Sequence, residues 1–197
     1  MKLIVAVDEK WGIGKNNDLL FSISADMKFF RQTTLNKVVV MGYKTLLSFP
    51  NSKPLKNRTN LVLSTKEPLR EDCKILRNFT ELKNELKNYN ENDVYLIGGA
   101  KVYNQLLNYC SHALITKVFA DGNAEVFIEN LDALENWIIE SESEIFEENG
   151  LKFQFITYCQ PFLGQLYNNI YKILSKNNRA HKNELDLFYK FLIFIFL

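Results

Sequence analysis

Two side chains near the start of the sequence have the types and spacing needed to bind a flat, nitrogen-containing ring. Asp26 and Phe30 lie four residues apart in SADMKFFRQTTL (24–35), whose apolar spacing predicts an amphipathic helix. If Ser24 is the N-cap, Asp26 falls in the first turn and shares one helix face with Phe30. Such a pair could accept hydrogen bonds from an N–C–N edge and pack on the rest of the ligand. The alternative is a carboxylate that only favours the start of a helix.

Three further stretches contain residues that could bind anions. Gly98 and Gly99 separate an apolar run from a helical pattern, and Gly42 precedes Thr45 in a similar position. Glycines let the backbone approach a phosphate, and the free N–H groups at a helix start bind anions. Arg58 could bind a carboxylate through two parallel hydrogen bonds. The complete G-x-G-x-x-G pattern is absent, so ordinary turns and an exposed arginine without a ligand are the alternatives.

Short apolar runs alternate with helical patterns along the chain, which is typical of an α/β domain. Asn149-Gly150 predicts a hairpin turn between two long strands within 137–160, because Asn-Gly readily adopts positive φ angles. The order of elements predicts a mixed, mostly parallel sheet that ends in an antiparallel pair. We expect strands at 3–7, 37–41, 59–65, 73–76, 93–97 and 112–120, and helices at 24–35, 43–49, 78–89 and 98–107.

Composition and charge favour a single core and a small-molecule ligand. The 197 residues carry 24 basic and 23 acidic side chains, a net charge of +1, which provides no basic surface for nucleic acid. The three cysteines and two histidines show no metal-ligand spacing, so we expect no metal site. We interpret the thiols as reduced and the location as cytoplasmic. The apolar run before Asp8 is too short for a signal peptide.

Residues 161–197 differ in character from the preceding chain and are predicted to form a C-terminal extension of unknown role. The final apolar stretch, 187–197, is interrupted by Lys190 and is shorter than the roughly 20 residues that a membrane-spanning helix needs. The extension could lie at a membrane interface, cover an exposed groove or have no function.

Five stretches in one order resemble the dihydrofolate reductase family, of the bacterial type: IVAVDEKWGIGKNNDLLFSISADMKFFRQTT, KVVVMGYKT, PLKNRTNLVLST, VYLIGGAKVY and ALITKV. The domain that the resemblance implies covers residues 1–160. It implies a three-layer α/β/α fold and an oxidoreductase that converts 7,8-dihydrofolate to 5,6,7,8-tetrahydrofolate by hydride transfer from NADPH. This reaction supplies one-carbon and thymidylate metabolism, and we expect a cytoplasmic monomer with no membrane span.

The resemblance also implies roles for residues at the substrate. Asp26 would hold the pterin ring, Thr116 would complete its hydrogen-bond network, and Arg58 would bind the glutamate α-carboxylate. Burial should raise the pKa of Asp26, and the proton for N5 is expected to come through water. Asp26, Phe21 and Thr116 are the implied catalytic residues. The implied dihydrofolate-binding residues are Ile4, Val5, Asp26, Met27, Phe30, Phe49, Leu55, Arg58 and Thr116.

The loop after the first strand, residues 8–20, is implied to be a lid that closes over the reacting rings and excludes water. Leu19 would form its apolar tip. The residues implied to bind NADPH are Ala6, Ile13, Gly14, Leu19, Gly42, Lys44, Thr45, Leu63, Ser64, Thr65, Ile97, Gly98, Gly99, Lys101, Val102 and Tyr103.

Two departures from the family pattern bear on these expectations. Tyr43 replaces the arginine that binds the 2′-phosphate of NADPH, for which Lys44 or Lys66 could substitute as point charges. The loop expected to support the lid reads EVFIE at 125–129 instead of the usual DTFFP, so we expect that loop to have changed.

Two other functions remain open from the sequence. A pyrimidine reductase of riboflavin synthesis would share the fold and NADPH, but would leave Asp26, Phe30 and Arg58 unexplained. A non-catalytic binding or assembly module is the second alternative. A degenerate site should have lost at least one of Asp26, Phe30, Arg58 and Thr116, and all four are retained.

Overall fold

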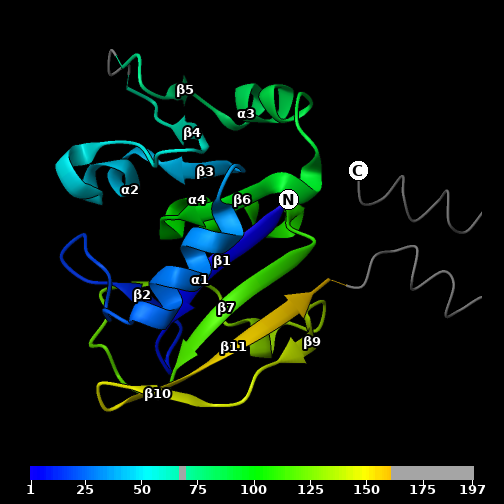
Figure 1. Cartoon of the computed structure of the whole chain (residues 1–197). Coiled ribbons are helices and arrows are strands. Elements are labelled where there is room, and N and C mark those ends of the chain that lie inside the picture. The colour runs from blue at the N-terminus through cyan, green and yellow to red at the C-terminus, as the bar shows by residue number, and fades with distance from the viewer. Residues whose placement is uncertain (67–69, 161–197) are drawn as a thin grey trace, which may run out of the picture.

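A mixed β-sheet forms the centre of the computed structural model, which describes residues 1–66 and 70–160 (Figure 1). Its strands are β1 (Lys2–Val7), β3 (Val38–Gly42), β4 (Thr59–Leu63), β5 (Lys74–Leu76), β6 (Val94–Gly98), β7 (His112–Val118), β9 (Ile138–Glu142), β10 (Phe146–Glu148) and β11 (Leu151–Cys159). The order is β10-β11-β7-β1-β6-β3-β4-β5, and β9 also pairs with β11. Pairings from β7 through β1 to β5 are parallel, whereas those made by β11 are antiparallel.

Helices cover both faces of this sheet. The helices are α1 (Ser24–Thr34), α2 (Tyr43–Ser48), α3 (Phe79–Leu86) and α4 (Ala100–Leu106). In β3, Val39 and Met41 pack in the cluster that contacts α1 and α2, whereas Val38 and Val40 pack with α3 and α4. Successive side chains of a strand point to opposite faces, so a strand covered on both sides needs a continuous apolar run. The predicted three-layer α/β/α fold is confirmed.

The direction of the central strands determines where a site can form. Because β1, β3, β4 and β6 are parallel, their carboxyl ends lie along one edge of the sheet. Ala6, Gly42, Leu63 and Gly98 are at or near these ends. Ligands of open α/β sheets bind in the crevice outside the carboxyl ends of the strands.

The hairpin at the end of the described chain differs in part from the prediction. Asn149 and Gly150 adopt φ angles of 53° and 78°, as predicted for the turn. The strand before the turn is broken into β9 and β10, however. At the break, Ser143 Oγ accepts a hydrogen bond of 3.1 Å from the Phe155 backbone N–H, so a side chain locally replaces the ladder carbonyl.

A second, two-stranded sheet was not predicted. It joins β2 (Gly12–Gly14) to β8 (Val126–Phe127), both of which are too short and too rich in glycine or exposed residues to give a strand pattern. Within the described ranges, no helix is long and apolar enough to cross a membrane. The predicted extension, 161–197, lies outside the described residues.

Candidate active site

Asp26 and Thr116 form a hydrogen-bonded pair between α1 and β7. Thr116 Oγ1 donates to Asp26 Oδ1 at 2.6 Å. Thr116 is only 1% exposed, because it lies in a central strand opposite Ala6 of β1 and Phe155 of β11. Burial raises the pKa of Asp26, and the hydrogen bond from Thr116 opposes this effect. Asp26 is therefore a partly buried carboxyl that retains its proton at higher pH than an ordinary aspartate.

The first turn of α1 is capped by a side chain from the other end of the described chain. The predicted Ser24 cap is wrong: Ser24 is the first helical residue, and the N-cap Ile23 offers no side-chain acceptor. Glu148 accepts hydrogen bonds from the backbone N–H groups of Ser24 at 2.7 Å and Ala25 at 3.1 Å, which lower its pKa. The carboxylate therefore replaces a local cap and fixes the turn that carries Asp26.

A cavity of about 470 Å³ opens beside α1 and contains a fixed guanidinium. Arg58 donates from Nε to Thr34 Oγ1, from Nη1 to the Lys56 carbonyl and from Nη2 to the Arg31 carbonyl. Burial, and then the charge of Arg31, lower the pKa of Arg58. No carboxylate in the described part of the chain pairs with it, so a bound anion would stabilise its charge. The cavity is lined by Met27, Lys28, Phe30, Arg31, Leu55 and Arg58.

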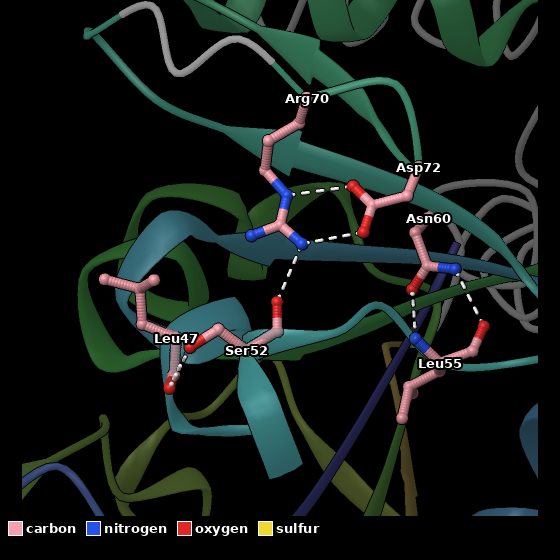
Figure 2. A network of polar contacts seen from close by, with 6 residues as sticks. All are labelled: Leu47, Ser52, Leu55, Asn60, Arg70 and Asp72. Carbon is pink, nitrogen blue, oxygen red and sulfur yellow. Dashed lines mark hydrogen bonds and ion pairs between the residues drawn. The ribbon is translucent and has the colours of Figure 1, made fainter.

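A buried asparagine holds the turn from Leu55 to Arg58 in place. Figure 2 shows Asn60, which is 7% exposed, accepting from the Leu55 N–H at 3.0 Å and donating to the Leu55 carbonyl at 2.9 Å. Asn60 also donates to the Arg58 carbonyl at 3.0 Å. The Asn60 side chain thus fixes the backbone of two residues that line the cavity, Leu55 and Arg58.

A second network in Figure 2 fixes the segment just before this turn. Arg70 donates to both carboxylate oxygens of Asp72, at 2.9 and 2.7 Å, and to the Ser52 carbonyl at 2.7 Å. The pairing lowers the pKa of Asp72 and raises that of Arg70, to which the Tyr43 hydroxyl also contributes. The Arg70 side chain therefore ties Ser52 to Asp72.

The carboxyl end of β6 lies close against the first turn of α2, which follows β3. Gly98 has φ of +133°, and a Cβ atom on Gly98 or Gly99 would lie 3.2 Å from Thr45 Oγ1. From α4, the Tyr103 hydroxyl donates to the carbonyl of Ile4 in the adjacent strand β1 at 2.9 Å. The structure therefore brings Gly98, Gly99 and Thr45 together, with Gly98 buried at the end of β6 and Gly99 half-buried.

Comparison with known proteins decides the family. The family model described as dihydrofolate reductase matches residues 1–160. The chain belongs to the dihydrofolate reductase family. It is 37% identical over 177 residues to a putative dihydrofolate reductase of Caenorhabditis elegans, covering 79% of this chain and 94% of that protein. It is 33% identical over 185 residues to the dihydrofolate reductase of Sus scrofa, covering 80% and 96%.

A solved structure agrees with this assignment. Dihydrofolate reductase from Enterococcus faecalis, complexed with NADP(H) and RAB-propyl, matches with a TM-score of 0.71 and 25% identity. The match covers 81% of this chain and 95% of that chain.

Apart from the Asp26–Thr116 pair, the residues that the family resemblance assigned to binding or catalysis at the substrate lie in different parts of the structure. Met27, Phe30, Leu55 and Arg58 line the cavity, and Phe49 and Ile4 pack with Phe30 in the adjoining apolar cluster. Val5 packs on the opposite face with α3 and α4, so only its backbone faces this side. Phe21 packs with Ile23, Val118 and Phe153, in a cluster separate from the cavity.

The residues assigned to the cofactor of this reductase family follow the carboxyl edge of the sheet. Ala6, Gly42, Leu63, Ile97 and Gly98 belong to strands, and Ser64 and Thr65 continue from β4. Lys101, Val102 and Tyr103 lie in α4, whereas Lys44 and Thr45 lie in α2. Ile13 and Gly14 are in β2, and Leu19, 61% exposed, lies beyond it in the lid.

The lid is paired with the loop whose sequence departs from the family pattern. Glu125 donates its backbone N–H to the Gly14 carbonyl at 3.0 Å, and its carboxylate accepts from the Asn16 N–H at 3.2 Å. Ile128 donates to the Trp11 carbonyl at 3.1 Å. Two of these three bonds use only backbone atoms, so they do not depend on which side chains stand at 125–129.

Proposed function

We propose that this member of the dihydrofolate reductase family reduces 7,8-dihydrofolate to 5,6,7,8-tetrahydrofolate, with NADPH as the hydride donor. The observation that carries the proposal is Asp26, whose pKa is raised by burial, held by Thr116 and placed on the same helix as the wall of a cavity that contains Arg58, which has no carboxylate partner among the described residues. This arrangement offers a carboxyl for an N–C–N edge, an apolar slot and a guanidinium for a carboxylate. Dihydrofolate contains all three complementary groups.

Asp26 is proposed to orient the pterin and to favour its protonation. Its carboxyl would bind N3 and the 2-amino group, while Thr116 fixes its rotamer. The reaction adds a hydride to C6 and a proton to N5, and the proton is proposed to come through water. A carboxyl whose pKa is raised by burial can hold a proton near the ring at a pH where free aspartate cannot.

The other end of the substrate is proposed to bind at the cavity. Phe30, Phe49 and Leu55 would pack against the aminobenzoyl ring, and Arg58 would bind the glutamate α-carboxylate. Three protein acceptors already hold the guanidinium, so little side-chain entropy remains to be lost on binding. Binding energy at this end would serve to place C6 at the hydride donor.

The strand ends fit the dinucleotide. Gly98 has a positive φ that favours glycine, and a Cβ atom on either glycine would crowd the Thr45 hydroxyl, so glycines at this strand end keep the backbone bare for a pyrophosphate. These residues, with Gly42, Lys101 and Val102, would hold the phosphates, and Ala6, Ile13 and Gly14 would border the nicotinamide. NADPH supplies the hydride when it is bound. Ser64, Thr65 and Lys44 are proposed to bind the adenosine-phosphate end.

The proposal includes a cytoplasmic location and a monomer. The free state of Cys73, Cys110 and Cys159 supports a reducing compartment. Sedimentation of the purified chain tests the monomer.

The first experiment follows the loss of NADPH absorbance when purified protein is mixed with dihydrofolate, and repeats it with NADH. Turnover with NADPH is expected. A folded protein that oxidises neither NADPH nor NADH in the presence of dihydrofolate would contradict the proposal and favour a non-catalytic module. Turnover of a pyrimidine intermediate of riboflavin synthesis, without dihydrofolate turnover, would assign the other reductase activity.

A further inference from the structure

Asp8, at the junction of β1 and the lid, is a buried carboxylate that the proposed reaction does not use. Its side chain is 0% exposed. Oδ1 accepts from the backbone N–H groups of Lys10 at 2.9 Å and Gly12 at 2.7 Å. Oδ2 accepts from the Gly122 N–H at 3.3 Å. One carboxylate therefore binds the start of the lid and the loop between β7 and β8.

The surrounding contacts reserve this carboxylate for backbone donors. The Lys10 ammonium, which could have paired with it, instead binds Asp121 Oδ2 at 2.6 Å on the surface. A Cβ atom on Gly12 would lie 2.8 Å from Asp8 Oδ2 and would collide with Ala124 Cβ. A buried carboxylate is costly unless its oxygens accept hydrogen bonds, so Asp8 favours the one arrangement that brings all three N–H groups together.

This junction is directly connected to the residues beside the nicotinamide position. The Asp8 N–H donates to the Gly12 carbonyl at 2.9 Å, and Trp11 donates back to the Asp8 carbonyl at 3.1 Å, which closes a tight turn. β2 begins at the end of that turn and carries Ile13 and Gly14. Its partner β8 follows Gly122 by a few residues, so Asp8 links the points from which both strands start.

We propose that Asp8 is a positioning residue for hydride transfer. By holding Gly12 and Gly122 on one carboxylate, it fixes β2 against β8 and so places Ile13 and Gly14 beside the reacting ring. This inference rests on the proposed reductase function. Its kinetic consequence is a defect in the chemical step, with little effect on dihydrofolate binding at the cavity, whose lining includes no residue of the 8–20 loop.

Asp8→Asn is the discriminating variant. The Asp8 carboxylate accepts hydrogen bonds from both segments. An asparagine amide, in either orientation, would present its oxygen to one segment and its NH2 group to the other. That NH2 group would face a backbone N–H, which is also a donor, so no hydrogen bond could form there. The substitution therefore cuts the link and keeps the size of the side chain. Asp121→Asn is the matched control, because Asp121 is an exposed carboxylate in the same loop and binds only Lys10 among lid side chains.

The kinetic readout separates positioning from a general loss of fold. Hydride transfer in Asp8→Asn should slow by about tenfold to 10²-fold, the effect of a small misplacement of reacting groups. The deuterium isotope effect measured with NADPH labelled at the transferred position should increase, and KM for dihydrofolate should stay near the wild-type value. Asp121→Asn should match the wild type. Wild-type turnover and isotope effect in Asp8→Asn would overturn the proposal.

Amide hydrogen exchange of the ligand-free protein provides a readout that does not depend on activity. Asp8→Asn should accelerate exchange at Gly12 or Gly122, while β1 and β6 keep their protection. If the wild type fails to reduce dihydrofolate, the proposed function fails, but this exchange experiment still tests the link. Unchanged exchange at both glycines would overturn it.

Asp8→Ser is the second variant, because it is smaller and introduces no buried amide donor. The same kinetic defect is expected. If neither variant retains exchange protection in β1 and β6, Asp8 is required for the fold as a whole and the positioning role is overturned.

Discussion

At the scale of single residues, burial and the hydrogen bond from Thr116 have opposing effects on the pKa of Asp26. Burial raises its pKa, so the folded protein holds the proton more tightly than the unfolded chain does. That contribution to stability is fully present below the ordinary aspartate pKa and is lost as the pH rises through the folded pKa. At a pH above that range, the raised pKa of Asp26 is therefore a cost to the stability of the fold.

Asp26→Asn should separate stability from catalysis. Turnover at neutral pH should fall by about 10²-fold to 10⁴-fold, the usual contribution of a positioned acid or base. The melting temperature at neutral pH should be unchanged or higher, because the amide can still accept from Thr116 and carries no buried charge. The advantage of the variant should shrink as the pH falls. Wild-type turnover, or a clearly lower melting temperature at neutral pH, would contradict the assignment.

Thr116→Val should shift the pH dependence in a defined direction. The Thr116 hydroxyl stabilises the ionised form of Asp26 and lowers its pKa, so removing the hydroxyl should raise that pKa further. If activity falls as Asp26 ionises, the falling limb of the pH-rate profile should move to higher pH. Measurement of kcat/KM across the pH range checks this. A shift to lower pH would mean that the hydroxyl does not favour the carboxylate.

At the scale of elements, the turn between α2 and β4 depends on one amide. Asn60→Ala would leave the Leu55 N–H and two carbonyls without their partner, which should destabilise the protein by about 1–3 kcal/mol. Because this turn carries Leu55 and Arg58, KM for dihydrofolate should rise while KM for NADPH stays constant. Thr59→Ala, an exposed neighbour in the same strand, is the control. An equal rise in both KM values would show that the turn does not act on the substrate alone.

At the scale of the whole molecule, local sequence patterns were sufficient to predict the layers of the fold but not its long-range contacts. The continuous apolar run at 38–41 predicts a strand buried on both faces, and it is one. Asp26 and Thr116, 90 residues apart, were paired only through the family resemblance. Nothing near Ser24 indicates that Glu148 caps its helix, and the local capping rule pointed to Ser24 instead. Asp8 was missed because backbone donors leave no signature in side-chain spacing.

A long-range contact also indicates where the functional unit ends. Gln160 donates its backbone N–H to the Ser111 carbonyl at 3.0 Å, so the described chain closes beside the start of β7. Every residue assigned to the proposed site lies before this point, and the match to the family model also covers residues 1–160. We propose that residues 1–160 fold and act without 161–197.

A protein truncated after Gln160 should therefore keep a kcat/KM close to that of the full chain, because every residue assigned to the proposed site lies within 1–160. Its melting temperature and its solubility should match those of the full chain. Both proteins are compared by NADPH oxidation and thermal unfolding under identical conditions. A large loss of turnover with an unchanged melting temperature would give the extension a direct role at the site. A loss of both would show that the apolar residues of 161–197 complete the fold, and residues 1–160 would then not be a self-sufficient domain.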